Sequence, residues 1–146
     1  QIKIQIQIHT MSTFTLSAQV GDQAEATTVV DNTLLATSVG SGDVEVYSTP
    51  SMIALMERAA VLTLNGKLDS AWTTVGTSIN ISHLSATPVN MSVRAVATIT
   101  AIDNRKITYN VEAFDSVEKI GEGVHERFAV DKQRFMSRTN SKGTPA

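Results

Sequence analysis

A single helical segment that is apolar on almost every side constrains this chain more than any other feature. Residues 49–66 read TPSMIALMERAAVLTLNG, and the only charged side chains among them are Glu57 and Arg58. A helix with this pattern is buried on most sides. Either a sheet curls around it, or a second copy of the chain covers what the sheet leaves open.

Residues with strong end preferences mark both limits of this helix. Thr49 is the predicted N-cap, and Pro50 stands at the first helical position, where its missing N–H does no harm. Asn65 and Gly66 predict a left-handed stop after the last turn.

After the helix the apolar residues recur at every second position, which indicates strands. Short turns such as Asp103-Asn104 and Asp115-Ser116 separate them, so the strands are expected to pair antiparallel. The pattern therefore predicts an α+β fold with one long helix and a curled antiparallel sheet, and it favours a dimer. The predicted strands after the helix cover residues 73–83, 91–101, 107–113 and about 119–131.

Composition narrows the function classes. The chain has 146 residues, no cysteine and a net charge of −2, which excludes thiolate metal sites and gives no sign of nucleic-acid binding. No apolar run approaches the roughly 20 residues of a membrane span. We expect a soluble, cytoplasmic single domain without a metal or cofactor.

The two ends are set apart from this domain. Residues 1–10, QIKIQIQIHT, alternate like an amphipathic strand but precede Met11, and we interpret them as a possible leader added for expression. The predicted domain covers residues 11–138, and residues 139–146 are expected to form a polar tail.

Three side chains near the helix are candidates for catalysis, each with a plainer alternative. His83 ends an apolar strand face and is either a half-exposed histidine without a role or a general base beside a pocket. Glu57 is either an exposed carboxylate or an acid that faces a site. Thr49 caps the helix, yet its hydroxyl also lies at the positive end of the helix dipole.

Two further residues stand out in the strands. Gly76 interrupts a strand, which is typical of a bulge or of a close approach to a ligand. Arg127 shares a strand face with His125, whereas charged strand faces are uncommon in a core. The histidines lack the HxH or HxxxH spacing of a metal site.

The segments TPSMIALMERAA, VGTSINISHLSATP and EGVHERF, in this order and at these intervals, resemble the fluoroacetyl-CoA thioesterase family, a branch of the hotdog-fold acyl-CoA thioesterases. The resemblance spans about residues 47–138. It implies a hotdog fold, a thioester hydrolase, and an acyl-CoA substrate whose coenzyme A is not a separate cofactor.

The resemblance also assigns roles. It puts catalytic residues at Thr49, Glu57 and His83, and substrate-binding residues at Gly76 and Arg127. Eight residues separate Thr49 from Glu57, about 12 Å along a regular helix, so both cannot touch one atom. Either Thr49 lies on a loop that folds back, or a second subunit supplies one of the two, which favours a site at a homodimer interface. A dimer of such dimers stays open.

The segment VGSGDVEVYS before the helix departs from the best-known member of this family. It offers only Tyr47 where an aromatic gate would single out a fluorinated acyl group, so we expect a short acyl-CoA without preference for fluoroacetyl. The basic residues after Asn104 would suit the phosphates of coenzyme A. Two alternatives remain: a non-catalytic module that binds acyl-CoA or another small ligand, and a hydratase-type lyase acting on enoyl thioesters.

Overall fold

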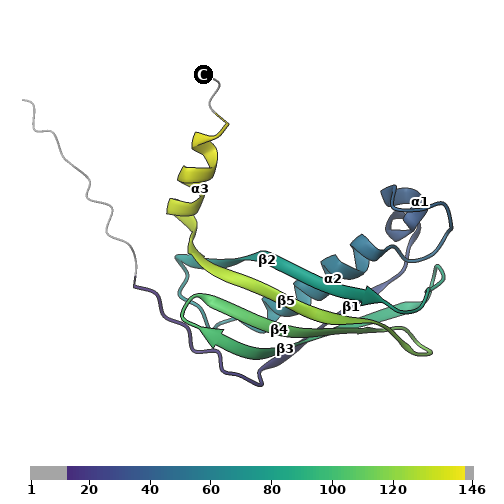
Figure 1. The fold of residues 1–146 in the computed structure, drawn as a ribbon, viewed down its shortest axis with the longest axis horizontal. Coiled ribbons are helices and arrows are strands. Elements are labelled where there is room, and N and C mark those ends of the chain that lie inside the picture. The colour runs from purple at the N-terminus through teal and green to yellow at the C-terminus, as the bar shows by residue number, and fades with distance from the viewer. Residues whose placement is uncertain (1–12, 144–146) are drawn as a thin grey trace, which may run out of the picture.

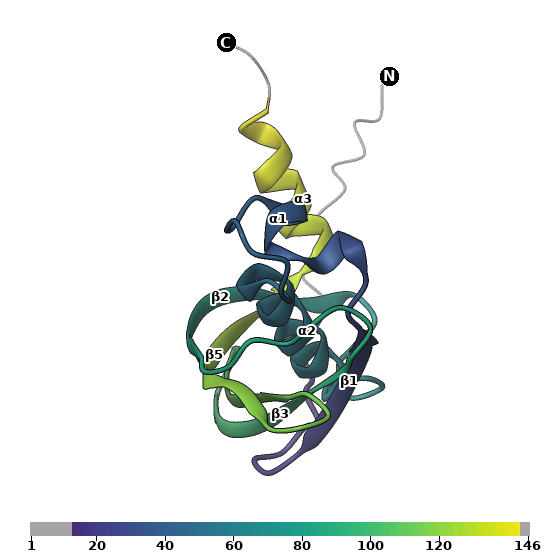
Figure 2. The ribbon, with the colours of Figure 1, turned by 90° about the vertical axis from the view of Figure 1, so that its right-hand side faces the viewer.

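A curled sheet wrapped around one central helix makes up the body of the protein (Figures 1 and 2). The computed structural model describes residues 13–143, so the proposed leader at residues 1–10 lies outside the described part. No helix there is long and apolar enough to cross a membrane. The elements are β1 (Gln23–Val29), a 3-10 turn (Asn32–Leu34), α1 (Ala36–Val39), α2 (Thr49–Leu62), β2 (Trp72–His83), β3 (Ser92–Asp103), β4 (Lys106–Phe114), β5 (Lys119–Asp131) and α3 (Lys132–Ser141).

The five strands form one antiparallel sheet in the order β1-β3-β4-β5-β2. The strands predicted from alternation are all present, and Asn104 takes a left-handed conformation (φ 54°) in the β3–β4 hairpin. The ends of the sheet curl toward each other around α2 in Figure 2. The predicted α+β hotdog architecture is thus confirmed, and β1 and β2 are its edge strands.

The N-cap of helix α2 lies one residue earlier than predicted. Ser48, not Thr49, is the N-cap: its backbone is extended and its hydroxyl accepts a hydrogen bond from the N–H of Ser51. Both residue types cap well, so the sequence alone cannot choose between neighbours. The helix ends at Leu62, and Gly66 takes its left-handed conformation (φ 72°) in the turn that follows.

One side of α2 faces the hollow of the sheet. Its residues there are essentially inaccessible: Met52, Met56, Ala59 and Ala60. They meet the inward side chains of β3 and β4, including Ile107, Tyr109 and Val111. The sheet leaves part of the helix open, because Val61 and Leu62 are 47% and 39% exposed.

A bulge in β2 changes which side chains face inward. The alternation at every second position that predicts the strand at residues 73–83 would put its odd-numbered residues on one face, and this is wrong because the register shifts between Gly76 and Ser78. Before the bulge Trp72 and Thr74 are buried, and after it the odd-numbered residues are the less exposed ones. The extra residue of a bulge reverses the alternation beyond it.

Helix α3 follows directly on β5 and includes residues 139–141, the start of the segment expected to be a polar tail. Asp131 caps it by accepting a hydrogen bond from the backbone N–H of Arg134 at 3.1 Å. None of its residues is buried, and Figure 1 shows it projecting from one end of the sheet. A helix without an apolar stripe gives no periodic signal, which is why the sequence pattern missed it.

Candidate active site

Thr49 and His83 form a close pair at one end of the molecule. The first residue of α2 and the last residue of β2 bring Oγ1 of Thr49 within 2.7 Å of Nδ1 of His83. Because Ser48 caps the helix, the Thr49 hydroxyl is free to make this contact. The arrangement lets the imidazole exchange a proton with the hydroxyl.

The surroundings of His83 favour its neutral form. Burial lowers the pKa of this imidazole from its ordinary value of 6.5. Its other ring nitrogen, Nε2, is buried and has no hydrogen-bond partner within residues 13–143. A neutral histidine beside a hydroxyl is the protonation state that a general base needs.

A cavity of about 390 Å³ opens beside this pair. Thr49 and His83 line it together with Tyr47, which is 1% exposed and whose pKa burial raises to about 12. Most of the remaining lining is small or aliphatic: Ala36, Ser41, Gly42, Val44, Val46, Ser48, Leu84, Ser85 and Ala86. The cavity has room for a small acyl group beside the Thr49–His83 pair.

Glu57 belongs to a second cluster, farther along α2. Its Oε2 accepts a hydrogen bond from Nη1 of Arg127 at 2.9 Å, and its side chain is 40% exposed. The carboxylate lies against the backbone of Gly76, where an added Cβ would collide with it. Gly76 therefore lets an ionised and partly accessible carboxylate approach the β2 bulge.

His125 is a member of this second cluster to which the sequence assigned no role. Its Nδ1 donates to the backbone carbonyl of Ser78 at 2.8 Å, so the lone pair of a neutral ring is on Nε2. Burial, and then the charge of Arg127, lower the pKa of His125. The 3.7 Å approach of Nε2 to Glu57 is therefore not an ion pair, and Nε2 instead accepts from Nη1 of Arg127 at 3.3 Å.

Arg127 is 6% exposed, and its three side-chain nitrogen atoms all donate hydrogen bonds to groups of the same chain. Nε donates to Oγ1 of Thr74 and Nη2 to the carbonyl of Thr74, at 2.9 and 3.0 Å. Nη1 holds Glu57. β5 is an interior strand, so the charge on its face reflects this internal network and not a sheet edge. Contact between Arg127 and a substrate stays a prediction, but its geometry suits the positioning of Glu57.

The two clusters do not meet within one chain. Thr49 and Glu57 lie on one continuous helix, about 12 Å apart along its axis, so Thr49 is not on a loop that folds back. On β2, Gly76 and His83 are seven residues apart, about 23 Å along the strand. The imidazole beside Glu57 is that of His125. Within residues 13–143, no group of three His, Cys, Asp or Glu side chains could hold a metal ion.

Comparison with known proteins identifies the family. Residues 29–133 match the family described as fluoroacetyl-CoA-specific thioesterase (FlK). The fluoroacetyl-CoA thioesterase of Streptantibioticus cattleyicolor is 34% identical over 102 residues, which are 70% of this chain and 73% of that protein.

Solved structures agree with this match. A structure of the fluoroacetyl-CoA thioesterase FlK superposes with a TM-score of 0.82 at 28% identity, over 87% of this chain and 98% of that one. Variants of FlK have been solved with fluoroacetate and CoA and with acetyl-CoA. A thioesterase superfamily member from Thermus thermophilus shares the fold, with a TM-score of 0.80 at 24% identity over 86% of this chain and 93% of that one. The chain belongs to the fluoroacetyl-CoA-specific thioesterase family and is an acyl-CoA thioesterase with the hotdog fold.

Proposed function

We propose that the protein hydrolyses the thioester of a short acyl-CoA at a site shared by two copies of the chain. The Thr49–His83 pair, at 2.7 Å and beside a cavity, is the observation that carries this proposal. Glu57 and Gly76 supply the other half of the site from the second copy.

In the proposed reaction, His83 takes the proton from the attacking oxygen, which is the Thr49 hydroxyl or a water bonded to it. The oxygen adds to the thioester carbonyl, and the backbone N–H of Gly76 stabilises the developing oxyanion. When the carbon–sulfur bond breaks, the thiolate takes the proton from His83 and leaves as free CoA thiol. If Thr49 attacked, a water then cleaves its ester in the same way, and the acid is released.

An exposed edge of the sheet supports the assembly of two copies. β2 lies at the edge, and Gly76, Thr77 and Ser78 in its middle are exposed. Two β2 strands paired antiparallel about an axis between residues 79 and 80 would bring His83 of one copy opposite Gly76 of the other. His83 and Gly76, which lie about 23 Å apart along β2 of one chain, would then be neighbours across the interface between two chains.

The cavity beside Thr49 supports a short acyl group without selection for fluorine. Its lining residues include no Phe or Trp, and its one aromatic residue, Tyr47, is buried with its backbone N–H bonded to the carbonyl of Thr87 at 2.8 Å. A side chain that is buried in this way has no free face with which to open and close the cavity. We expect acetyl-CoA, propionyl-CoA and fluoroacetyl-CoA to be hydrolysed with specificity constants that differ by about tenfold or less after correction for intrinsic reactivity.

Release of free thiol from a panel of acyl-CoAs tests the proposal. Wild-type protein is expected to turn over the short members, and His83→Ala to lose about 10²–10⁴-fold in kcat, the usual contribution of a general base. A pre-steady-state burst of thiol would assign the attack to Thr49. Absence of turnover across the panel, or wild-type rates for His83→Ala, would refute the proposal.

A further inference from the structure

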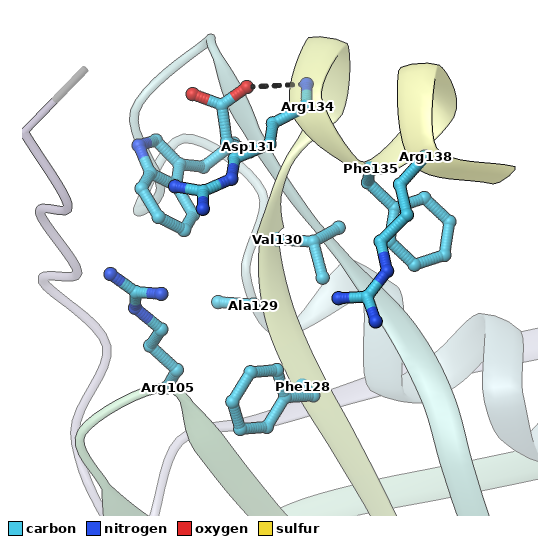
Figure 3. Close-up of a pocket in the computed structure, with 9 residues that line it drawn as sticks. Arg105, Phe128, Ala129, Val130, Asp131, Arg134, Phe135 and Arg138 are labelled. Carbon is cyan, nitrogen blue, oxygen red and sulfur yellow. Dashed lines mark hydrogen bonds between the residues drawn. The ribbon is translucent and has the colours of Figure 1, made fainter. Parts of the chain in front are cut away.

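A second cavity lies at the other end of β2, away from the Thr49–His83 pair (Figure 3). Its volume is about 300 Å³, which is within the usual range for small-ligand sites. The first residue of β2, the β3–β4 turn, the end of β5 and α3 line this open cavity. Its lining residues are Trp72, Arg105, Phe128, Ala129, Val130, Asp131, Arg134, Phe135 and Arg138.

The cavity carries a net positive charge. Its lining residues include three arginines, Arg105, Arg134 and Arg138, and one acid, Asp131. Figure 3 shows Arg105 and Arg138 on two sides of the cavity, with the end of β5 between them. From Lys132 to the end of the chain the sequence has four basic residues and no acidic one. Guanidinium groups at separate positions suit a ligand with more than one phosphate.

Aromatic rings accompany these charges. The guanidinium carbon of Arg105 lies 4.9 Å from the centre of the Trp72 ring. Phe128 and Phe135 are 40% and 38% exposed at the cavity, although large apolar side chains are costly to leave in water. Flat, partly exposed rings beside arginines suit a ligand that carries both a planar base and phosphates.

The distance from this cavity to Gly76 is within the length of the pantetheine arm of CoA. Trp72 lies four residues from Gly76 on β2, about 13 Å, and eleven residues from His83, about 36 Å. The pantetheine arm is about as long as five extended residues, roughly 17 Å. A nucleotide bound in this cavity could deliver its thioester to Gly76 and Glu57 of the same chain, but not to His83 of that chain.

We propose that this cavity binds the phosphorylated adenosine end of the CoA substrate. The inference rests on the proposed function and deepens it, since it names the surface that holds the nucleotide. Each chain then holds its substrate with α3 and the ends of β2 and β5, and presents the thioester to its own Glu57 half of the shared site.

Calorimetric titration with adenosine 3′,5′-bisphosphate, adenosine and inorganic phosphate tests the binding step. The bisphosphate is expected to bind at least tenfold more tightly than either of the others, because only it engages rings and arginines together. Arg138→Gln is expected to weaken it about 5- to 10-fold, while Lys142→Gln, which removes the same charge outside the cavity, changes it less than twofold. Equal effects of the two variants, or binding of phosphate as tight as that of the bisphosphate, would overturn the assignment.

Kinetics with two substrates separate this inference from the proposed function. Arg138→Gln is expected to raise KM for acetyl-CoA about 5- to 10-fold with kcat unchanged. It should leave kcat/KM unchanged for S-acetyl-N-acetylcysteamine, which lacks the nucleotide. An unchanged KM for acetyl-CoA would overturn the inference while wild-type turnover upholds the thioesterase site. A wild-type protein that cleaves neither substrate would instead remove the proposed function, and the bisphosphate titration would still decide whether the cavity binds a nucleotide.

Discussion

The pKa of His83 sets the pH range in which its imidazole can act as a base beside Thr49. Burial lowers the pKa of His83 below its ordinary value of 6.5, and the base must be unprotonated to act. We therefore expect kcat/KM for acetyl-CoA to rise with pH, with a midpoint below 6.5, and to be level above it. Thiol release measured at constant ionic strength from about pH 5 to 8 gives this profile. A midpoint near 7.5 would mean that another group titrates.

Substitution of Arg127 is expected to lower the stability of the protein more than substitution of Glu57. Removing the guanidinium leaves both oxygens of Thr74 without their donors, so Arg127→Met is expected to lower the free energy of unfolding by about 2–4 kcal/mol. Glu57→Gln changes a side chain that is 40% exposed and should cost about 1 kcal/mol or less. Urea unfolding of both variants measures the difference.

Two further measurements complete this comparison: the activity of Glu57→Gln and the stability of a third variant, Arg127→Lys. If Glu57 takes part in the reaction, Glu57→Gln lowers kcat at least tenfold although its fold is nearly intact. Arg127→Lys keeps the charge but not the fork of donors, and should recover part of the stability. A Glu57→Gln variant with wild-type kcat would make the cluster a purely structural one.

At the scale of helices and strands, most elements could be predicted from the alternation of apolar residues and from capping residues. A strand with one buried face must alternate, so β4 and β5 were predictable from their sequences alone. The β2 bulge was suggested by Gly76, but its effect on the faces was not, because one extra residue reverses every position after it. Helix α3 has no buried residue, and so left no pattern to find.

The site was only partly predictable for a related reason. Thr49, Glu57, His83, Gly76 and Arg127 stand out in the sequence and the resemblance assigns their roles, whereas their grouping depends on strand register. The bond from Arg127 to Glu57 joins residues 70 positions apart, and no local pattern encodes such a contact. His125 could have been found from its shared strand face with Arg127.

The neighbours of Gly76 and Gly123 predict different outcomes for alanine at these two positions. In Gly76→Ala the new Cβ would meet the Glu57 carboxylate, a movable group, so we expect kcat to fall at least tenfold and stability by about 1 kcal/mol. In Gly123→Ala it would meet the backbone carbonyl of Asn80, which cannot move freely, and stability should fall by about 3 kcal/mol or more. Gly143→Ala, whose new Cβ would make only ordinary contact with the carbonyl of Asn140 and which lines neither cavity, is the neutral control. Thermal melting and thiol release on the three variants test the contrast, and equal loss of stability at Gly76 and Gly123 would contradict it.

At the scale of the whole molecule, the Thr49–His83 pair and the Glu57 cluster do not meet within one chain, and the proposed function makes them the two halves of a shared site. The exposed edge strand β2 and the open side of α2 at Val61 and Leu62 are the surfaces a second copy would cover. A two-fold axis makes both shared sites at once, because each copy gives its Thr49 half to one and its Glu57 half to the other. Catalysis would then depend on protein concentration below the dissociation constant of the pair.

Mixed dimers test this arrangement directly. His83→Ala and Glu57→Gln are each expected to be nearly inactive as homodimers, since every site carries a defect. In a heterodimer of the two, purified through different tags, both defects fall in one shared site and the other site is intact. Such a heterodimer should therefore regain about half of the wild-type kcat per dimer. If each chain instead housed a complete site, both sites of the heterodimer would stay defective, and no rescue would occur. A double variant, His83→Ala with Glu57→Gln, paired with wild type is the matched control: shared sites leave it with one defect in each, and it should be nearly inactive, whereas separate sites would leave it half active.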